Sequence, residues 1–543
     1  MIPFKGKKGG TMSELYENGT IITMEENCPE VEAVLTENGK IVKCGTKDEL
    51  AAFKKEDTRV IDLKGKTMMP AFLDGHSHFT GFAMSLSQCD LSGAKDFDDI
   101  VRLMKEFIRE NHIPEGSWVT GTNYDHNFLK EKKHPDKEVL NRISEKHPVV
   151  IVHASSHMGV ANSMALREKK LDGNTKDPAG GKYGRVSGSS ELNGYMEENA
   201  FVAFRNHMPM PKVEDIVKLL KKAQEIYASY GIATVQEGMV TEPLFQILQL
   251  AESRKLLYLD LVGYVDEENS RDLLLSHRDM TEGYHQHLKI GGYKIFLDGS
   301  PQGRTAWMKE PYEGAGDGYR GYPIKTDEQL YGLILNALKD GQQVIAHCNG
   351  DAAAEQYITQ FEKVHRDYPD LDTERPVMIH AQLAEPFQMK RMKELSMMPS
   401  FFVAHTYYWG DIHIENFGRE RAKNISAAGS AVRAGIPFTF HQDSPVLYPD
   451  MFKTVWCAVN RVTRKGVELS KEERTSVYDA LKANTVNAAF QYGEEDIKGS
   501  IREGKNADFI ILDRNPLKVP ADEVKDVRVL KTIKDGNVIF ERK

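Results

Sequence analysis

The segment DGHSH at residues 74–78 contains two histidines with the spacing of metal ligands. It ends an apolar run, and alternate residues of a strand point to the same face, so we expect His76 and His78 to share one face. Two imidazoles on one face of a strand end can hold a divalent cation. Taken alone, the pair fits a metal site and two surface histidines equally well.

Four further polar residues lie within or at the end of later apolar segments. Lys294 stands inside GGYKIFLDG, where a lysine is costly to bury unless it is paired or chemically altered. His347 ends QQVIAH, His380 ends PVMIH and Asp443 ends IPFTFHQD. A lone histidine in such a position is usually structural. Six polar residues that lie in or at the end of successive apolar segments indicate one common site.

The segments that carry these residues belong to a long strand–helix alternation over residues 71–496. Helical patterns such as VEDIVKLLKKAQEIYASYG and DEQLYGLILNALKDG separate short apolar runs. This alternation predicts an α/β fold with a parallel sheet, closed as a (β/α)8 TIM barrel. The carboxyl ends of barrel strands meet on one face, where the polar residues would come together. The turn-rich stretch 123–210 is too long for one loop, and we expect an insertion near the mouth of the barrel.

The two ends of the chain differ in character from the middle. Residues 12–70 and 497–543 alternate apolar and polar residues, and the pairs Asn38-Gly39 and Asp535-Gly536 mark hairpin turns. We expect the two ends to pair into one small β-sandwich domain. Residues 1–11 are basic and glycine-rich, and we expect them to form a flexible tail.

Composition and charge exclude several classes of protein. Hydrophobic residues make up 40% of the 543 residues and charged residues 28%, which rules out a disordered chain, a collagen and a coiled coil. The net charge of −9, without a dominant basic patch, argues against nucleic acid as a partner. No apolar run reaches the ~18 residues of a membrane-spanning helix. The five cysteines form no CxxC pair and the N-terminus lacks the apolar core of a secretory signal, so we expect a cytoplasmic protein.

The order HxH, lysine, histidine, histidine, aspartate resembles the amidohydrolase superfamily. More narrowly, the chain resembles amidohydrolase family 3, in the N-substituted formamide deformylase-like group. The resemblance covers residues 14–540. It rests on the segments MPAFLDGHSHF, PVVIVHASSHMGVANSMAL, GIATVQEG, GGYKIFLDGSPQGRTAWMKEPY, VIAHCNGDAAAE, VMIHAQL, HQDSPV and SIREGKNADFIILDRNP.

The resemblance implies a two-metal centre. His76 and His78 would hold the more buried ion, and His347 and His380 the more exposed one. Lys294, carboxylated by carbon dioxide, would bridge the two ions; other members of the superfamily use one ion, or a glutamate or cysteine bridge. Two zinc ions are the expected occupants because imidazole-rich sites favour zinc, and iron, manganese and nickel remain alternatives. The resemblance to this family also implies a homodimer.

A mechanism follows from this ligand set. Two cations lower the pKa of a bridging water, which supplies a metal-activated hydroxide. Asp443, a ligand and the expected catalytic residue, would take a proton from that water and hand it to the leaving nitrogen. His157 resembles a substrate-side histidine of the family and would hydrogen-bond the developing oxyanion, unless it is a structural loop histidine.

Four further residues are candidates for substrate binding. Arg304 in GSPQGRTA could bind an anionic group of the substrate or tie down its own loop. Tyr407, Tyr408 and Trp409 are three consecutive aromatic residues beside a glycine, and would suit an aromatic or apolar substituent.

The leading hypothesis is a metal-dependent hydrolase that cleaves the C–N amide bond of a small molecule, an N-substituted formamide or an N-acyl compound. A deaminase or cyclic-amide hydrolase on the same scaffold is the first alternative. A catalytically silent binding or regulatory barrel is the second, and the intact ligand set argues against it. The glycine loops GGKYGR and GSPQG have neither the Walker lysine–serine spacing nor a GxGxxG motif followed by a helix, which argues against nucleotide binding, and the chain has no GxSxG elbow of a serine hydrolase.

Overall fold

A computed structural model describes residues 13–155, 158–178, 180–206, 212–371 and 375–543. The chain divides into two compact units, which we call the large unit (Met1–Phe79 and Gln224–Lys543) and the small unit (Thr80–Ala223). Helices α2 (Phe79–Ser85) and α7 (Val213–Ser229) contain the two boundaries. The stretch 123–210 falls within the small unit.

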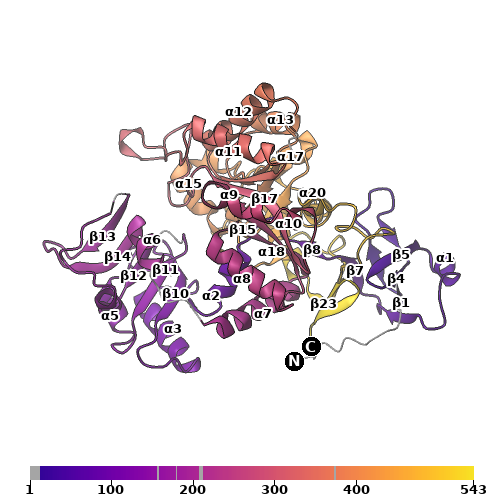
Figure 1. The fold of residues 1–543 in the computed structure, drawn as a ribbon, viewed down its shortest axis with the longest axis horizontal. Coiled ribbons are helices and arrows are strands. Elements are labelled where there is room, and N and C mark those ends of the chain that lie inside the picture. The colour runs from indigo at the N-terminus through magenta and orange to yellow at the C-terminus, as the bar shows by residue number, and fades with distance from the viewer. Residues whose placement is uncertain (1–12, 156–157, 179, 207–211, 372–374) are drawn as a thin grey trace. The chain divides into compact units, whose positions relative to one another are not determined.

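The large unit is built on one curled sheet of eight parallel strands (Figure 1). Neighbouring strands pair in the order β21-β20-β19-β18-β17-β16-β15-β8. The expected α/β fold with a parallel sheet is therefore confirmed. The strands are β8 (Phe72–Leu73), β15 (Ile232–Val240), β16 (Asp260–Asp266), β17 (Leu288–Phe296), β18 (Gln343–Cys348), β19 (Val377–His380), β20 (Met398–Phe401) and β21 (Thr439–Phe440).

Helices lie between the strands of this sheet and cover it (Figure 1). Strand β19 is buried along its whole length, which explains its nearly continuous apolar sequence. The helices are α8 (Glu242–Ser253), α9 (Glu267–Ser276), α10 (Asp279–Glu282), α11 (Asp327–Lys339), α12 (Asp351–Asp367), α13 (Pro386–Glu394), α14 (His405–Tyr408), α15 (Gly410–Phe417), α16 (Arg419–Ala422), α17 (Ala428–Ala434), α18 (Met451–Asn460), α19 (Val477–Ala483) and α20 (Val486–Gln491).

Helix α11 shows how the sequence fixes these elements locally. The hydroxyl of Thr326 accepts a hydrogen bond from the backbone N–H of Gln329, whose side chain accepts from the backbone N–H of Thr326. The helix buries one apolar face, which includes Leu330 and Ile334. It ends before Gly341, whose φ of +68° is a left-handed conformation that glycine adopts without strain.

The register of the sheet brings the polar residues to one edge. Phe296 of β17 pairs with His347 of β18, and Cys348 of β18 pairs with His380 of β19. Successive parallel strands therefore end side by side, and the side chains that end them share one edge.

Strands from both ends of the chain pair in a second sheet of the large unit (Figure 1). It has the order β24-β23-β22-β7-β2-β3, with β7 (Thr67–Pro70) antiparallel to β22 (Phe509–Leu512). Its other strands are β2 (Thr20–Ile22), β3 (Glu30–Val31), β23 (Val529–Lys534) and β24 (Asn537–Glu541). A third sheet holds β1 (Ser13–Glu17), β4 (Ala33–Glu37), β5 (Lys40–Gly45) and β6 (Arg59–Asp62), and α1 (Lys47–Ala51) follows β5. Val34 of the third sheet and Phe509 of the second share one apolar core.

The small unit contains a mixed sheet of six strands, in the order β13-β14-β12-β11-β10-β9. Strands β10 and β11 are parallel, so Tyr124 at the end of one pairs with His153 at the end of the other. The strands are β9 (Cys89–Asp90), β10 (Val119–Tyr124), β11 (Val149–His153), β12 (Met158–Ala161), β13 (Gly181–Arg185) and β14 (Leu192–Glu198). The helices are α3 (Phe97–Glu110), α4 (Lys137–Asn141), α5 (Ser163–Glu168) and α6 (Asn199–Asn206).

All five cysteines are free thiols. Within the described part of the chain, every helix is too short or too polar to cross a lipid bilayer.

Candidate metal centre

His76 and His78 follow β8 at the edge where the strands of the large unit end. His76 is 1% exposed, and its Nδ1 donates a hydrogen bond to Oε1 of Gln236 over 2.5 Å. A neutral imidazole with its hydrogen on Nδ1 has its lone pair on Nε2. Nε2 of His76 is therefore the nitrogen available to a cation, and Gln236 fixes both the tautomer and the orientation of the ring.

Asp443 faces both of these histidines. Its Oδ1 lies 3.6 Å from Nε2 of His76 and 3.6 Å from Nε2 of His78. Among the described residues, this buried oxygen has no hydrogen-bond partner. A buried carboxylate oxygen without a donor is unfavourable in an apo protein, because its desolvation is not compensated. The same three side chains form one of the groups that could hold a metal ion.

Lys294 of β17 reaches the same point. It is 1% exposed, and its Nζ lies 3.2 Å from Nε2 of His76. Burial lowers the pKa of Lys294 to about 7, although the carboxylate of Asp443 acts in the opposite direction. Close to neutral pH, much of this lysine is therefore an uncharged amine.

His347 and His380 complete the set. Their ring centres are 4.6 Å apart, and the ring of His380 lies 5.8 Å from that of His76. Nδ1 of His347 is 3.5 Å from Oδ1 of Asp298, a carboxylate that accepts hydrogen bonds from the backbone N–H groups of Asn349 and Gly350. The structure thus gathers the six residues singled out in the sequence in one cluster, which we call the metal centre.

Two residues of the metal centre have strained backbones. His380 has a φ of +73° and Asp443 a φ of +52°, in the left-handed region that costs a residue with a side chain about 1–3 kcal/mol. Such strain persists only where the surrounding structure holds it, and it is concentrated at functional sites. His380 is the last residue of β19, and Asp443 follows the end of β21, so both strained residues lie at the ends of strands.

The electrostatic state of the histidines suits metal binding. Burial, and then the charge of Lys294, lowers the pKa of His78 to about 3. Burial also holds the pKa values of His76 and His380 well below the ordinary range, with neighbouring cationic groups adding to the effect. His76, His78 and His380 are therefore neutral at physiological pH, which is the form that ligates a metal. Burial raises the pKa of Asp443 to about 6, and Lys294 partly opposes this rise.

Three residues at the centre were not anticipated from the sequence. His441 is fully buried, with Nε2 3.1 Å from Nδ1 of His380 and Nδ1 3.0 Å from the hydroxyl of Ser400. Oε1 of Glu237 lies 3.8 Å from Nδ1 of His78. The HxD spacing of His441 and Asp443 is the one local feature of the sequence that could have pointed to His441. Glu237 and its neighbour Gln236 had no such signal in the sequence beyond their place in the segment GIATVQEG.

The expected substrate-binding aromatics lie in different surroundings. Trp409 packs on His405, with ring centres 4.6 Å apart, and on Phe402, whose ring lies 5.3 Å from that of His441. Tyr407 packs instead against Trp456, at 5.3 Å, and against the ammonium group of Lys453.

Tyr408 has the guanidinium of Arg464 4.8 Å from its ring centre. Nε of Arg304 donates a hydrogen bond to Oδ1 of Asn416 over 2.8 Å, a contact that anchors its loop. His157 lies outside the described residues.

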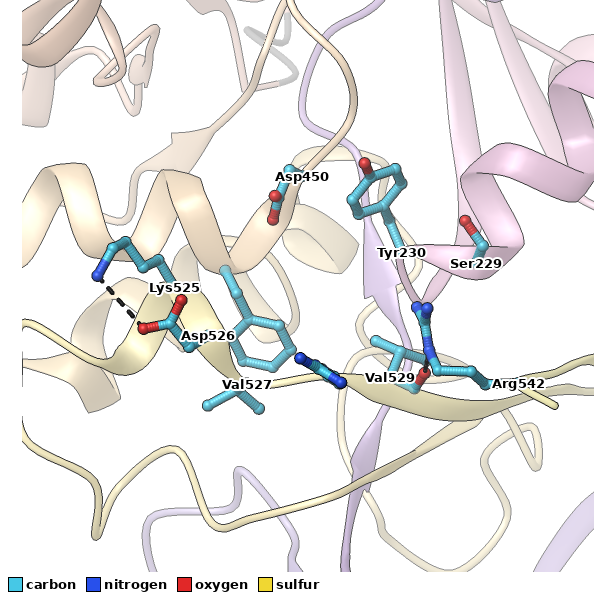
Figure 2. Close-up of a pocket in the computed structure, with 10 residues that line it drawn as sticks. Ser229, Tyr230, Asp450, Lys525, Asp526, Val527, Val529 and Arg542 are labelled. Carbon is cyan, nitrogen blue, oxygen red and sulfur yellow. Dashed lines mark hydrogen bonds and ion pairs between the residues drawn. The ribbon is translucent and has the colours of Figure 1, made fainter.

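A separate pocket of the large unit is drawn in Figure 2. Its wall includes Asp450, Lys525 and Arg542, and none of the six residues of the metal centre. Lys525 is paired with Asp526 at 3.3 Å, and Nε of Arg542 donates to the backbone oxygen of Val529 (Figure 2). Lys525 and Arg542 are thus engaged by neighbouring groups, and we assign no chemistry to this pocket.

Comparison with known proteins identifies the family. The model of the amidohydrolase family matches residues 59–540. The chain belongs to the amidohydrolase family. It is 26% identical over 547 residues to the N-substituted formamide deformylase of Arthrobacter pascens, with 97% of this chain and 98% of that protein covered. It is also 27% identical to the protein LONG AFTER FAR-RED 3 of Arabidopsis thaliana, with 97% and 91% covered.

The same relationship holds for solved structures. A metal-dependent hydrolase from Pyrococcus horikoshii OT3 is 27% identical to this amidohydrolase, with a TM-score of 0.76 and coverage of 94% of this chain and 99% of the other. The family implies a hydrolase with a divalent metal. The neutral imidazole of His78 and Oδ1 of Asp443, which has no hydrogen-bond partner among the described residues, fit a cation at this centre.

Proposed function

We propose that this amidohydrolase cleaves the C–N amide bond of a small molecule, an N-substituted formamide or an N-acyl amine. The observation that carries the proposal is the shared position of Asp443, whose Oδ1 faces Nε2 of both His76 and His78 at 3.6 Å. The similarity to the N-substituted formamide deformylase of Arthrobacter pascens supports this class of substrate.

Six residues would hold the metal: His76, His78, Lys294, His347, His380 and Asp443. We expect two ions of the zinc class, because imidazoles predominate among the ligands. When bound, such cations lower the pKa of water and polarise a carbonyl oxygen. The near-neutral pKa of Lys294 supports its carboxylation, since the uncharged amine is the form that adds to carbon dioxide. The addition forms an N–C bond and releases a proton, and the resulting anion would relieve the burial of an ammonium group.

Asp443 would act as the proton carrier. A carboxylate with a pKa near 6 is ionised at neutral pH and is basic enough to accept a proton from water. It would then return the proton to the nitrogen that leaves, so that an amine rather than an amide anion departs. Glu237 and Gln236 would hold the imidazoles of His78 and His76 in place while this happens.

The substrate would be held by residues outside the metal centre. We propose that Trp409 contacts an apolar substituent, since it packs on Phe402 and His405 next to His441. Tyr407 and Tyr408 would extend this aromatic surface. Arg304 would stabilise its loop or bind an anionic group, and His157 would hydrogen-bond the oxyanion.

We also infer that the parallel sheet closes into a (β/α)8 barrel and that the terminal strands form a β-sandwich. A Cβ atom on Gly75, just after β8, would lie 2.9 Å from the backbone oxygen of Phe440 in β21, so the two outer strands approach each other. The terminal sheets share one apolar core, which supports the sandwich. A cytoplasmic homodimer remains our expectation for the whole protein.

A substrate screen tests the function. The purified protein, reconstituted with zinc, is incubated with N-substituted formamides, N-acyl amines, amino-acid amides, cyclic amides and aminated heteroaromatic rings, and the released amine, acid and ammonia are measured. We expect formate or another carboxylate to appear together with an amine. Release of ammonia from a ring, opening of a cyclic amide alone, or no turnover of any compound would contradict the proposal.

A further inference from the structure

A second cluster of potential ligands lies entirely within the small unit. Nδ1 of His126 is 3.1 Å from Nε2 of His153, and Oδ1 of Asp125 is 3.8 Å from the first nitrogen and 3.5 Å from the second. These three side chains form a group able to hold a metal ion, and they share no residue with the metal centre of the large unit. The activity proposed above makes no use of them.

The spacing of the three atoms matches a small cation. Zinc binds nitrogen and oxygen ligands at about 2.0–2.2 Å in a tetrahedron, which places neighbouring ligand atoms about 3.3–3.6 Å apart. The observed separations of 3.1, 3.5 and 3.8 Å lie around this range. A cation could therefore enter with shifts of a few tenths of an ångström in the side chains.

The backbone holds the ligands at the end of two paired strands. His153 ends β11 and faces Tyr124, the last residue of β10, and Asp125 follows Tyr124 directly. The backbone N–H of Asn127 donates to Oδ1 of Asp125 over 2.8 Å, which fixes the carboxylate in the turn. Parallel strands that end together thus create a binding edge here, as they do in the large unit.

Surrounding groups orient the imidazoles. The ring of His134 lies 4.1 Å from that of His126, and Nδ1 of His134 is 2.9 Å from the hydroxyl of Tyr124. The hydroxyl of Ser155 lies 2.9 Å from Nδ1 of His153 and can accept a hydrogen from it when Nε2 binds a cation. Without a cation, the backbone N–H of Ser155 donates to this Nδ1 over 3.1 Å, which places the ring hydrogen of His153 on Nε2. A cation bound to Nε2 would therefore move that hydrogen to Nδ1.

Charge and access fit the same interpretation. Burial and the neighbouring His153 lower the pKa of His126. Burial acts to raise the pKa of Asp125, but the hydrogen bonds from His153 and the backbone of Asn127, together with the charges of His153 and His126, outweigh burial and lower this pKa. A carboxylate and neutral imidazole are the forms that bind zinc. The side chains of Asp125 and His153 are 10% and 6% exposed, whereas His126 is 27% exposed and gives solvent access to the cluster.

We propose that Asp125, His126 and His153 form a second site for a divalent cation of the zinc class, in which these are the three ligands that the described residues supply and a fourth position would take water or an external ligand. Three protein ligands and one open position are the arrangement of zinc sites that exchange ligands, rather than of closed structural sites.

The test is the metal content of the full-length protein. The unchanged chain and the variants Asp125→Ala, His126→Ala and His153→Ala are equilibrated with buffered zinc, and bound zinc per chain is measured by mass spectrometry. Each variant should bind one equivalent less than the unchanged chain. The matched control His112→Ala changes an exposed histidine of the small unit and should lose no zinc.

The double variant His76→Ala/His78→Ala separates the two sites. It should lose metal from the large unit and keep the zinc that His126→Ala removes. If the three single variants bind as much zinc as the unchanged chain, the second site does not exist. Circular dichroism checks the fold. If the variants fail to fold, anomalous diffraction at the zinc edge from crystals of the unchanged protein decides the question: a peak between the three side chains supports the site, and its absence overturns it.

Discussion

Oδ1 of Asp443 lies 3.6 Å from Nε2 of His76, although the whole small unit and about half of the large unit separate these residues in the chain. The contact joins the first and the last of the polar residues that end the parallel strands. It also leaves a buried carboxylate oxygen facing imidazole lone pairs without a donor among the described residues. This arrangement is unfavourable by itself and becomes favourable when a cation is bound, because the cation attracts every group that points to it.

Removing the charge of Asp443 should abolish proton transfer. In Asp443→Asn the side chain keeps its shape but cannot accept a proton at neutral pH, so we expect kcat/KM for an N-substituted formamide to fall about 10²- to 10⁴-fold. Steady-state kinetics and a thermal unfolding scan measure the two effects separately. The exposed Asp496, changed to asparagine, serves as a control and should leave activity unchanged. Near-normal turnover in Asp443→Asn would show that another group carries the proton.

Replacing Lys294 should remove metal and activity together. The variant Lys294→Ala lacks the amine that would carry the bridging anion, so we expect a lower zinc content and the loss of turnover. A short carboxylic acid such as acetate or propionate should restore part of both, because it fills the space and supplies two oxygens. Zinc per chain is measured with and without the added acid. The exposed Lys390 provides the matched control, Lys390→Ala. Full zinc content in Lys294→Ala would exclude the lysine as a bridge.

A methyl group on Gly238 should displace a ligand. A Cβ atom at this position would lie 2.4 Å from Cε1 of His76, closer than atoms can pack, and 3.1 Å from Nδ1 of the same ring. In Gly238→Ala we expect the imidazole to leave Gln236 and the zinc affinity to fall about 10- to 100-fold, the usual effect of losing an orienting contact. Competition with a chelator measures this affinity.

The control for that substitution is Gly332→Ala. Gly332 lies in helix α11 with nothing within 4 Å of the added Cβ atom. Alanine is the better helix former, so we expect unchanged zinc affinity and a gain in stability of up to about 1 kcal/mol. Equal zinc affinity in the two variants would show that the contact between Gly238 and His76 does not position the ligand.

Acid should destabilise the large unit through Asp260. This buried carboxylate is paired with Lys498 at 2.6 Å and with Lys534 at 3.0 Å. Burial acts to raise its pKa, but the two lysines and His287 outweigh burial and depress it strongly. A depressed folded-state pKa stabilises the protein above the unfolded pKa of about 4 and loses this contribution as the pH falls further.

The variant Asp260→Asn isolates that effect. Two buried ammonium groups would each lose one carboxylate partner, while Lys498 keeps Glu494 and Lys534 keeps Asp508. We expect the free energy of unfolding at pH 7 to fall by about 1–3 kcal/mol. Denaturant unfolding at pH 7 and below pH 4 measures the difference, which should shrink in acid. The exposed Asp57, changed to asparagine, is the control. A difference that stays constant with pH would show that ionisation of Asp260 is not responsible.

Short segments of the sequence predict a large part of this protein's fold and of its candidate metal centre. The spacing of His76 and His78 depends on strand alternation, and the polar residues that end apolar segments depend on the length of a parallel strand. Both are properties of a few neighbouring residues, so they predict the α/β fold, the parallel sheet and the six residues of the metal centre. The function of those six residues stays a prediction until metal binding is measured.

Tertiary structure decided which distant groups meet. Gln236 and Glu237 reach His76 and His78 because β15 pairs with β8, and His441 reaches His380 through β20, which separates their strands in the sheet. In the small unit, Asp125 and His153 meet because β10 and β11 end in register. Strand pairing is set by packing of the whole sheet, which no short segment encodes. The sequence by itself therefore determined the type of each ligand, and the folded sheet determined its partners.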